Sequence, residues 1–381
     1  MNHLNEEVVE YRRHVARWVD ERLLPQARRI DEDSDFGFEL LRELGALGYI
    51  GTMYPEEVGG SAATFPYTCY TVLCEELARG SMGFAAGVCM QGSTATHTLY
   101  AWGSDVVKEK FLKPALRGEK IAAFAITEPN AGSDAASLKT RATRADGGWV
   151  LDGSKIFTSN GTVADVITVV ATTDPGKGTR GLELFVVDTT WDGFRVGRRL
   201  DKVSVRASDT AELFFEGLFV PDDHCLGDGS GGGFLRAYQA LTVDRIFTAA
   251  LALGNAQAAY DAALCYAKER VQFGQPIGKF QAVQFRLVDM LARLEQARLY
   301  TYHGAALADR GAPIATEAAI AKIVAAEGGH AVCEGTMAIF GGYGLMSDYP
   351  AQRYLRDSYF PMIGGGTGDI MRLVVARQLG F

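Results

Sequence analysis

Residues 124–134, FAITEPNAGSD, carry the residue types best suited to hold a polar, planar ligand. A short apolar run ends at two turn-forming pairs, Pro129-Asn130 and Gly132-Ser133, which interrupt a possible strand. Thr127 and Ser133 bring hydroxyl groups, and the loop between them exposes backbone N–H groups. Hydroxyls and free amides can each satisfy an acceptor on a ring. By themselves these residues are also compatible with an ordinary loop that has capping hydroxyls.

Three further motifs follow in order along the chain. They are KIFTSNG at residues 155–161, RVQFG with PIG and FQ at residues 270–281, and FGGYG with RYLRD at residues 340–357. Together with the first stretch, their order and spacing resemble the acyl-CoA dehydrogenase family over essentially the whole chain. The resemblance implies an α+β fold with an N-terminal helical domain, a middle β-barrel domain and a C-terminal four-helix bundle. It also implies bound FAD and a homotetramer built from dimers.

The resemblance further implies which residues contact the cofactor. Those expected to line the flavin ring are Phe124, Ile126, Thr127, Ser133, Phe157 and Ser159. Arg270 and Phe273 match residues that reach the FAD diphosphate and adenosine of a neighbouring subunit, and an arginine offers a fixed fork for phosphate oxygens. The alternative for Arg270 is an ordinary surface arginine. The remaining expected cofactor residues are Gln281, Gly341, Gly342 and Thr367.

The proton acceptor departs from the commonest arrangement of the family. Most members carry it in a motif similar to Tyr-Glu-Gly-Thr, but residues 364–367 read GGGT here, so Gly365 has no side chain at the Glu position. A minority carries a Glu directly before an Arg on a helix of the last domain, and the corresponding pair here is Asp244-Arg245. We therefore predict Asp244 as the catalytic base, with burial raising its pKa and Arg245 lowering it. The alternative is that Asp244 and Arg245 make an interdomain salt bridge.

The implied reaction is the α,β-oxidation of an acyl thioester, in which the flavin N5 accepts a hydride. Ser133 and Arg245 are expected to contact the substrate, and an electron-transfer flavoprotein or similar redox partner to accept the electrons in fatty acid metabolism. Thr242 stands where some members have an Asp that touches the pantetheine arm, so CoA and acyl-carrier-protein thioesters both remain open. Alternatives are an enoyl-thioester reductase running in reverse, a flavin-dependent monooxygenase on the same fold, and a non-enzymatic thioester-binding member.

Composition excludes other classes of protein. A chain of 381 residues suggests two or three domains, and the net charge of −8 argues against a nucleic-acid partner. The six cysteines form no C-x-x-C pair and no zinc spacing, which indicates free thiols in a reducing compartment and no metal site. Residues 1–7 are polar and lack the apolar core of a signal peptide. Because no apolar run approaches the ~20 residues of a membrane span, we expect no membrane insertion and a cytoplasmic protein.

Periodicity divides the chain into three expected domains. Residues 1–120 show apolar residues at helical spacing, residues 121–230 show short β-branched runs bounded by turns, and residues 231–381 return to Ala-rich helical patterns. In the first domain, Glu75 and Glu76 are expected on a solvated helix face rather than in a catalytic site. Strands this short and regularly spaced in the middle domain indicate a small barrel or sandwich.

Overall fold

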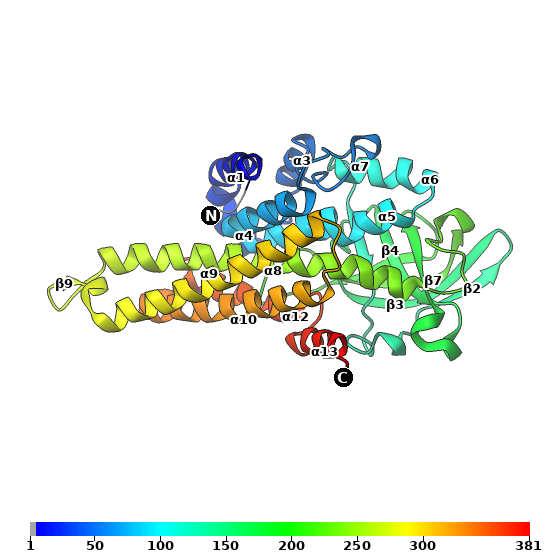
Figure 1. Cartoon of the computed structure of the whole chain (residues 1–381). Helices are drawn as coiled ribbons and strands as arrows, with labels where there is room; N and C mark the ends of the chain where they lie inside the picture. Colours follow the sequence, from blue (N-terminus) through cyan, green and yellow to red (C-terminus); the bar gives the residue numbers. More distant parts are fainter. Residues whose placement is uncertain (1–4) are drawn as a thin grey trace.

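The computed structural model describes residues 5–381 and places a β-sheet between two helical parts of the chain. Figure 1 shows the sheet at one end of the molecule, with the longest helices extending away from it. The predicted α+β class and the order of helices, strands and helices are confirmed. Residues 1–4, the start of the polar N-terminal stretch, lie outside the described residues.

Helices account for the chain before the first strand. The α-helices are α1 (Glu6–Trp18), α2 (Ala27–Glu32), α3 (Phe38–Ala46), α4 (Pro66–Met90), α5 (Thr96–Trp102), α6 (Asp105–Val107) and α7 (Lys113–Leu116). Three π-helical turns lie among them, at Val19–Leu23, Gln91–Ala95 and Lys108–Leu112. The expected apolar stripe is confirmed, because Val15 and Leu23 are fully buried in one core with Leu73 and Leu77 of α4.

Glu75 and Glu76 are buried, which corrects the expectation of a solvated helix face. Their exposed fractions are 2% and 6%. Arg12 of α1 donates to Glu75 at 2.6 Å and to Glu76 at 2.8 Å, and Arg298 of α9 (Gln281–Asp309) also donates to Glu75. Sequence spacing places both acids on one turn of α4, but the arginines arrive from distant helices. The acids are therefore stable in the interior because each is paired and hydrogen-bonded.

The middle part of the chain forms one mixed sheet of seven strands. They are β1 (Ala122–Ala125), β2 (Arg141–Ala145), β3 (Gly148–Ser159), β4 (Val166–Thr172), β5 (Leu182–Asp188), β6 (Phe194–Arg199) and β7 (Thr210–Pro221). β1 runs parallel to β4, whereas β3 runs antiparallel to both β2 and β7. The β-rich domain expected from the sequence takes the form of this sheet, whose strand order begins with β1 and ends with β6, while β5 pairs with β4 outside that order. Every residue of β4 and β5 is buried, which explains their almost continuous apolar sequences.

Long helices dominate the C-terminal part of the chain. They are α8 (Gly233–Glu269), α9 and α10 (Ala315–Phe340), followed by the shorter α11 (Ala351–Ser358), α12 (Phe360–Ile363) and α13 (Gly368–Gln378). A hairpin of β8 (Val271–Gln272) and β9 (Gln275–Pro276) connects α8 to α9. At about 1.5 Å per residue, the 37 residues of α8 span roughly 55 Å. The hairpin therefore lies at the opposite end of the molecule from the sheet (Figure 1).

In residues 5–381, the helices and the acidic, thiol and imidazole side chains are distributed as follows. None of their helices is long and apolar enough to cross a membrane. Within the same residues, no group of three or more His, Cys, Asp or Glu side chains is placed to hold a metal ion.

Candidate active site

The loop after β1 is held beside β3 by a buried lysine. Lys155 Nζ donates to the Ile126 carbonyl at 3.0 Å and to Glu128 Oε1 at 2.8 Å. The Ile156 N–H donates to the Thr127 carbonyl at 2.9 Å. Burial lowers the pKa of Lys155 to about 8, although Glu128 opposes this shift. These bonds bring together two of the motifs that the sequence singles out.

A β-bulge in β3 turns an aromatic side chain outward next to this loop. The pairing of β3 with β7 shifts register between Lys155 and Thr158, and Phe157 within the bulge has φ of 58°. Phe157 is 64% exposed, and the Thr158 hydroxyl is buried without a hydrogen-bond partner among residues 5–381. Bulges often re-aim a side chain beside an active site. An exposed ring with free hydroxyls and amides nearby fits one face of a planar cofactor.

The expected ring-side residues do not all present their side chains to this face. Thr127 and Ser159 are half-buried and Ser133 is exposed, as a binding surface requires. Phe124 is only 5% exposed and packs in the core cluster that includes Ala131 and Leu138. In this arrangement, its side chain supports the loop from behind.

A second group of expected cofactor residues lies at the far end of α8. Arg270 follows the last residue of α8 and lies over the Tyr343 ring at 5.2 Å. Phe273 is 94% exposed with φ of 51°. Gly341 and Gly342 are exposed and face open space, and Gln281 is exposed at the start of α9. Arg270, Phe273 and Gln281 lie in or next to the β8–β9 hairpin, at the opposite end of the molecule from the sheet that contains Phe157 (Figure 1).

Asp244 lies in the middle of the molecule on α8, facing the π-helical turn Gln91–Ala95. Asp244 is buried, with only 6% of the residue exposed. The Ser93 hydroxyl lies 2.6 Å from Asp244 Oδ1, and the Thr248 hydroxyl lies 3.5 Å from Oδ2. Burial raises the pKa of Asp244, while Ser93 and the positive charges of Lys322 and Arg245 oppose the rise. π-Helical turns of this kind are frequent at functional sites.

Gly365, which stands at the expected Glu position, lies beside the Asp244 carboxylate. Gly365 has φ of 67°, and a Cβ atom built on it lies 3.6 Å from Asp244 Oδ2 and 3.5 Å from Thr248 Oγ1. The Asp244 carboxylate therefore lies directly beside Gly365, the position at which the resemblance described above places the base of most family members.

Arg245 makes no salt bridge with Asp244. The Arg245 side chain lies over the Tyr238 ring at 5.0 Å and is 5% exposed. No carboxylate oxygen of residues 5–381 lies within 4.0 Å of it, and its buried Nε and Nη1 atoms have no hydrogen-bond partner there. The structure thus contains none of the pairing that the alternative for Asp244 requires.

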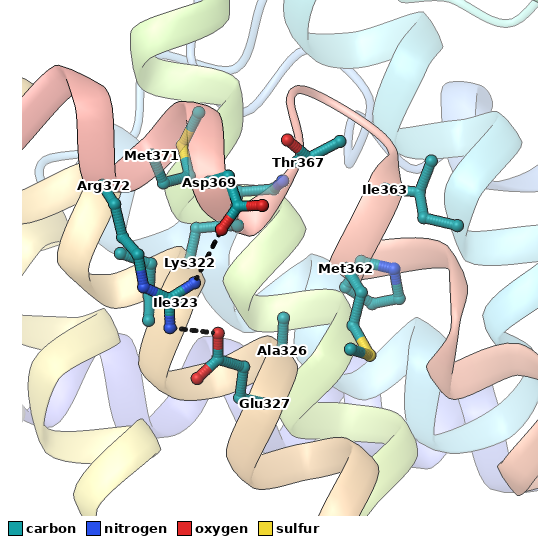
Figure 2. A pocket seen from close by; sticks show the side chains of 12 residues that line it. Lys322, Ile323, Ala326, Glu327, Met362, Ile363, Thr367, Asp369, Met371 and Arg372 are labelled. Carbon is teal, nitrogen blue, oxygen red and sulfur yellow. Dashed lines mark hydrogen bonds and ion pairs between the residues drawn. The ribbon is translucent and has the colours of Figure 1, made fainter.

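A pocket of about 310 Å³ opens between α10, α12 and the start of α13. Figure 2 shows Lys322, Thr367, Asp369 and Arg372 on its walls. Lys322 is 1% exposed, and its Nζ donates to the Gly366 carbonyl. Burial and the nearby Arg245 lower the pKa of Lys322 to about 8, while Asp244 opposes the shift. Lys322 is therefore shared between this pocket and the surroundings of Asp244.

Two residues of this site, Ser93 and Lys322, were not predicted from the sequence. Ser93 is one of several hydroxyls in residues 91–98 and has no distinguishing context. Lys322 carries a weak signal, since it is the single charged residue in the apolar run of residues 318–326. Such a residue on a buried helix indicates a partner elsewhere in the fold.

The fold and the site define a flavoprotein dehydrogenase that acts on acyl thioesters. Family models for the acyl-CoA dehydrogenase N-terminal, middle and C-terminal domains match residues 5–119, 123–218 and 231–380. The chain belongs to the acyl-CoA dehydrogenase family, whose members are oxidoreductases acting on CH–CH groups.

Individual relatives agree over nearly the full length. The chain is 44% identical to a benzylmalonyl-CoA dehydrogenase of Aromatoleum aromaticum, over 96% of this chain and 95% of the relative. It superimposes on a glutaryl-coenzyme A dehydrogenase in complex with glutaryl-CoA with a TM-score of 0.96, at 34% identity, covering 99% and 96% of the two chains. It also matches a chain from a study of the electron transferring flavoprotein of Acidaminococcus fermentans, with a TM-score of 0.95, at 37% identity, covering 99% and 98%.

Proposed function

We propose that this protein is an FAD-dependent α,β-dehydrogenase of acyl thioesters in which Asp244 accepts the α-proton. The observation that carries this proposal is the 3.6 Å between Asp244 Oδ2 and a Cβ built on Gly365. A carboxylate from α8 reaches the place where most relatives position their base. The carboxylate is buried, which raises its pKa toward the range where a general base is effective.

The residues of the chain supply binding, orientation and proton transfer. Bound FAD supplies a two-electron acceptor for the hydride. The loop of Thr127 and the bulge of Phe157 would hold its ring, and Thr367, at the start of α13, would bind its phosphate side. Asp244 takes the proton from the carbon beside the thioester carbonyl, and the Ser93 hydroxyl orients its carboxylate. Asp244 itself is shielded from solvent, because only 6% of the residue is exposed.

The separation of the two cofactor groups supports a homo-oligomer. Arg270 and Phe273 of one subunit would serve the FAD of a neighbour, because the β8–β9 hairpin next to them lies at the opposite end of the molecule from the sheet that contains Phe157. We propose the homotetramer that the resemblance implies, with an electron-transfer flavoprotein or similar partner as electron acceptor. A place in fatty acid metabolism and in the cytoplasm belongs to the same proposal.

The reverse reaction is a second candidate function. Burial raises the pKa of Asp244 and so favours its protonated form, which is the form that donates a proton to an enoyl thioester. In that case the same residues reduce a double bond, and Asp244 acts as the acid.

The experiment mixes the purified holoenzyme anaerobically with saturated and α,β-unsaturated thioesters while the flavin absorbance is followed. Bleaching by a saturated acyl thioester establishes the dehydrogenase, and the panel includes butyryl-, isovaleryl- and benzylmalonyl-CoA. Reoxidation of the reduced flavin by enoyl thioesters alone establishes the reductase. Absence of bleaching together with rapid reaction of reduced flavin with O₂ would replace both with the monooxygenase.

A further inference from the structure

A buried polar connection joins the surroundings of Asp244 to the strand that precedes the loop after β1. β1 pairs with β4 along one edge, and the strand order of the sheet begins with β1. β1 also contacts α4 and the π-helical turn Gln91–Ala95. Buried N–H and C=O groups on the edge of a sheet need partners other than a neighbouring strand. Ala122, the first residue of β1, is 1% exposed and has such groups.

Gln91 binds the N–H group of Ala122. The Ala122 N–H donates to Gln91 Oε1 at 2.7 Å. Gln91 Nε2 donates to the carbonyl oxygen of Lys120 at 2.8 Å and to that of Ala115 at 2.9 Å. The Gln91 side chain is fully buried, and its oxygen and both its N–H donors are used. Gln91 therefore fixes the start of β1 against the π-helical turn that also carries Ser93.

Asn160 binds the carbonyl group of the same residue. Asn160 directly follows β3, is fully buried and has φ of 62°, a conformation that Asn adopts more readily than most residues. Its Nδ2 donates to the Ala122 carbonyl at 3.3 Å and to the Gly87 carbonyl of α4 at 3.2 Å. Two carboxamides thus hold Ala122 through both of its backbone groups and tie it to α4 and to the turn that follows α4.

These bonds complete a short path between Asp244 and the loop after β1. The Ser93 hydroxyl contacts Asp244 at 2.6 Å, and Ser93 lies two residues after Gln91 in the same π-helical turn. Beyond Ala122, β1 continues only to Ala125 and therefore spans about 13 Å. A shift of Ala122 relative to the turn would therefore move the loop relative to Asp244.

We propose that Gln91 is a positioning residue that sets the distance between the Asp244 carboxylate and the flavin ring, with Asn160 as its partner. This inference rests on the proposed function, because it assumes that the ring lies against the loop after β1. In that reaction the α-proton goes to Asp244, the electron pair left behind forms the C=C bond, and the β-hydrogen leaves with its electron pair to the flavin. Both transfers must be aligned at once, and a displacement of about 1 Å can cost ~10²-fold in rate.

The test measures the two transfers separately. Flavin reduction by a saturated thioester such as butyryl-CoA requires both transfers. Exchange of α-protons with D₂O is measured on 3-thiabutyryl-CoA, in which sulfur replaces the β-carbon, so this exchange requires proton transfer alone. Anaerobic rapid mixing gives the first rate and mass spectrometry gives the second. Titrations give the dissociation constants of FAD and of the thioester for the same samples.

Variants of the two carboxamides should uncouple these rates. Gln91→Met keeps the length of the side chain and removes its hydrogen bonds. Flavin reduction should fall ~10–100-fold, while α-proton exchange and both dissociation constants change by less than about threefold, because Ser93 and Asp244 stay together. Gln91→Glu should give an intermediate result, since it keeps an oxygen that accepts from Ala122.

Asn160→Gly is a second, independent variant. It keeps the backbone at φ of 62° without strain and removes the amide, so it should act in the same direction as Gln91→Met. If Gln91→Met does not fold, Asn160→Gly and Gln91→Glu decide the outcome.

Asn255→Leu is the matched control. Asn255 of α8 is also a buried carboxamide, 2% exposed, and it donates to the Tyr354 carbonyl of α11 at 2.9 Å. It joins two elements as Gln91 does, but it contacts neither the π-helical turn nor β1. The variant should lower the unfolding temperature and leave the ratio of flavin reduction to α-proton exchange unchanged.

Three results would overturn the inference. One is an unchanged rate of flavin reduction in Gln91→Met, and another is an equal fall of both rates. The third is a failure of all the carboxamide variants to fold, which would assign Gln91 and Asn160 to stability alone. An unmodified enzyme that shows neither flavin reduction nor α-proton exchange refutes the proposed function instead. An unmodified enzyme with both activities, combined with an unchanged ratio in Gln91→Met, refutes only the positioning role.

Discussion

The Ser93 hydroxyl lies 2.6 Å from Asp244 Oδ1 and 2.5 Å from the carbonyl oxygen of Cys89. A serine hydroxyl has one proton and both neighbours are acceptors when Asp244 is ionised. Ser93 therefore donates to ionised Asp244, or it donates to Cys89 and accepts a bond from protonated Asp244. The protonation state of Asp244 and the orientation of one hydroxyl are thus coupled.

The first prediction concerns this hydrogen bond. Ser93→Ala removes a donor to the ionised carboxylate, so the pKa of Asp244 should rise further. The apparent pKa in the pH profile of flavin reduction should move upward by ~1–2 units, which corresponds to one hydrogen bond to a charged group. Rapid-mixing measurements between pH 5 and 9 give the profile. A downward shift of the apparent pKa, or an unchanged profile, would show that Ser93 does not stabilise the ionised form of Asp244.

The second prediction concerns Asp244 as the base. Asp244→Asn should retain FAD and thioester binding but reduce the rate of flavin reduction by ~10²–10⁴-fold, the usual contribution of a general base. Asp244→Glu should retain part of the rate, because the charge is kept and only its reach changes. Asp261→Asn is the matched control, since it changes an exposed aspartate of the same helix. Reduction of Asp244→Asn at the unmodified rate would contradict the assignment.

The third prediction returns a carboxylate to the commoner position. Gly365→Glu in the Asp244→Asn background places a Cβ 3.6 Å from the former Asp244 oxygen position and should restore part of flavin reduction. Recovery should be incomplete, because a non-glycine residue at φ of 67° costs of order 1 kcal/mol. Gly365→Gln provides the same bulk without the charge. Equal recovery with Gln would show that packing, not proton transfer, is restored.

The fourth prediction concerns the shared cofactor site. Arg270→Ala should weaken FAD retention ~10–100-fold, because it removes hydrogen bonds to a diphosphate. Mixed oligomers made from Arg270→Ala and Phe157→Ala subunits should regain some intact sites, because each variant lacks a different half. FAD content per subunit after size-exclusion chromatography measures both effects. Arg286→Ala, at an exposed residue of α9, is the control. A monomer that holds FAD tightly would refute the arrangement.

The fifth prediction concerns stability and pH. Burial raises the pKa of Glu75, but the charges of Arg12 and Arg298 outweigh it and the net shift is downward. The ion pairs therefore stabilise the fold fully above the unfolded-state pKa of about 4.3, and this stabilisation is lost as the pH falls through the lower folded-state value. Glu75→Gln should lower the free energy of unfolding by ~3 kcal/mol at pH 7 and by less at pH 3.

Denaturant unfolding at both pH values measures this difference. Glu10→Gln is the control, because Glu10 makes only exposed pairs, with Arg13 and His14, and should change the free energy of unfolding by less than ~1 kcal/mol. An equal loss of stability for Glu75→Gln at pH 3 and pH 7 would contradict an ionised Glu75.

The sequence by itself determined the order of helices, strands and helices, and it singled out the two motifs that we propose to hold the cofactor. Local periodicity decides these features. β4 is almost continuously apolar because both its faces are buried, and α1 has apolar residues at helical spacing because one of its faces is buried. Residue type and order also placed Asp244 next to Arg245 and left Gly365 without a side chain.

Only the tertiary structure decided which of these residues meet. Asp244 and Gly365 come together because the loop before α13 folds back onto α8, and no local pattern records that approach. Glu75 is buried because Arg12 and Arg298 reach it from other helices, which a helical wheel of α4 alone cannot show. The same packing directs the Arg245 side chain away from the Asp244 carboxylate and brings Lys322 near both charged groups. Burial and long-range pairing depend on the whole chain rather than on neighbours in sequence.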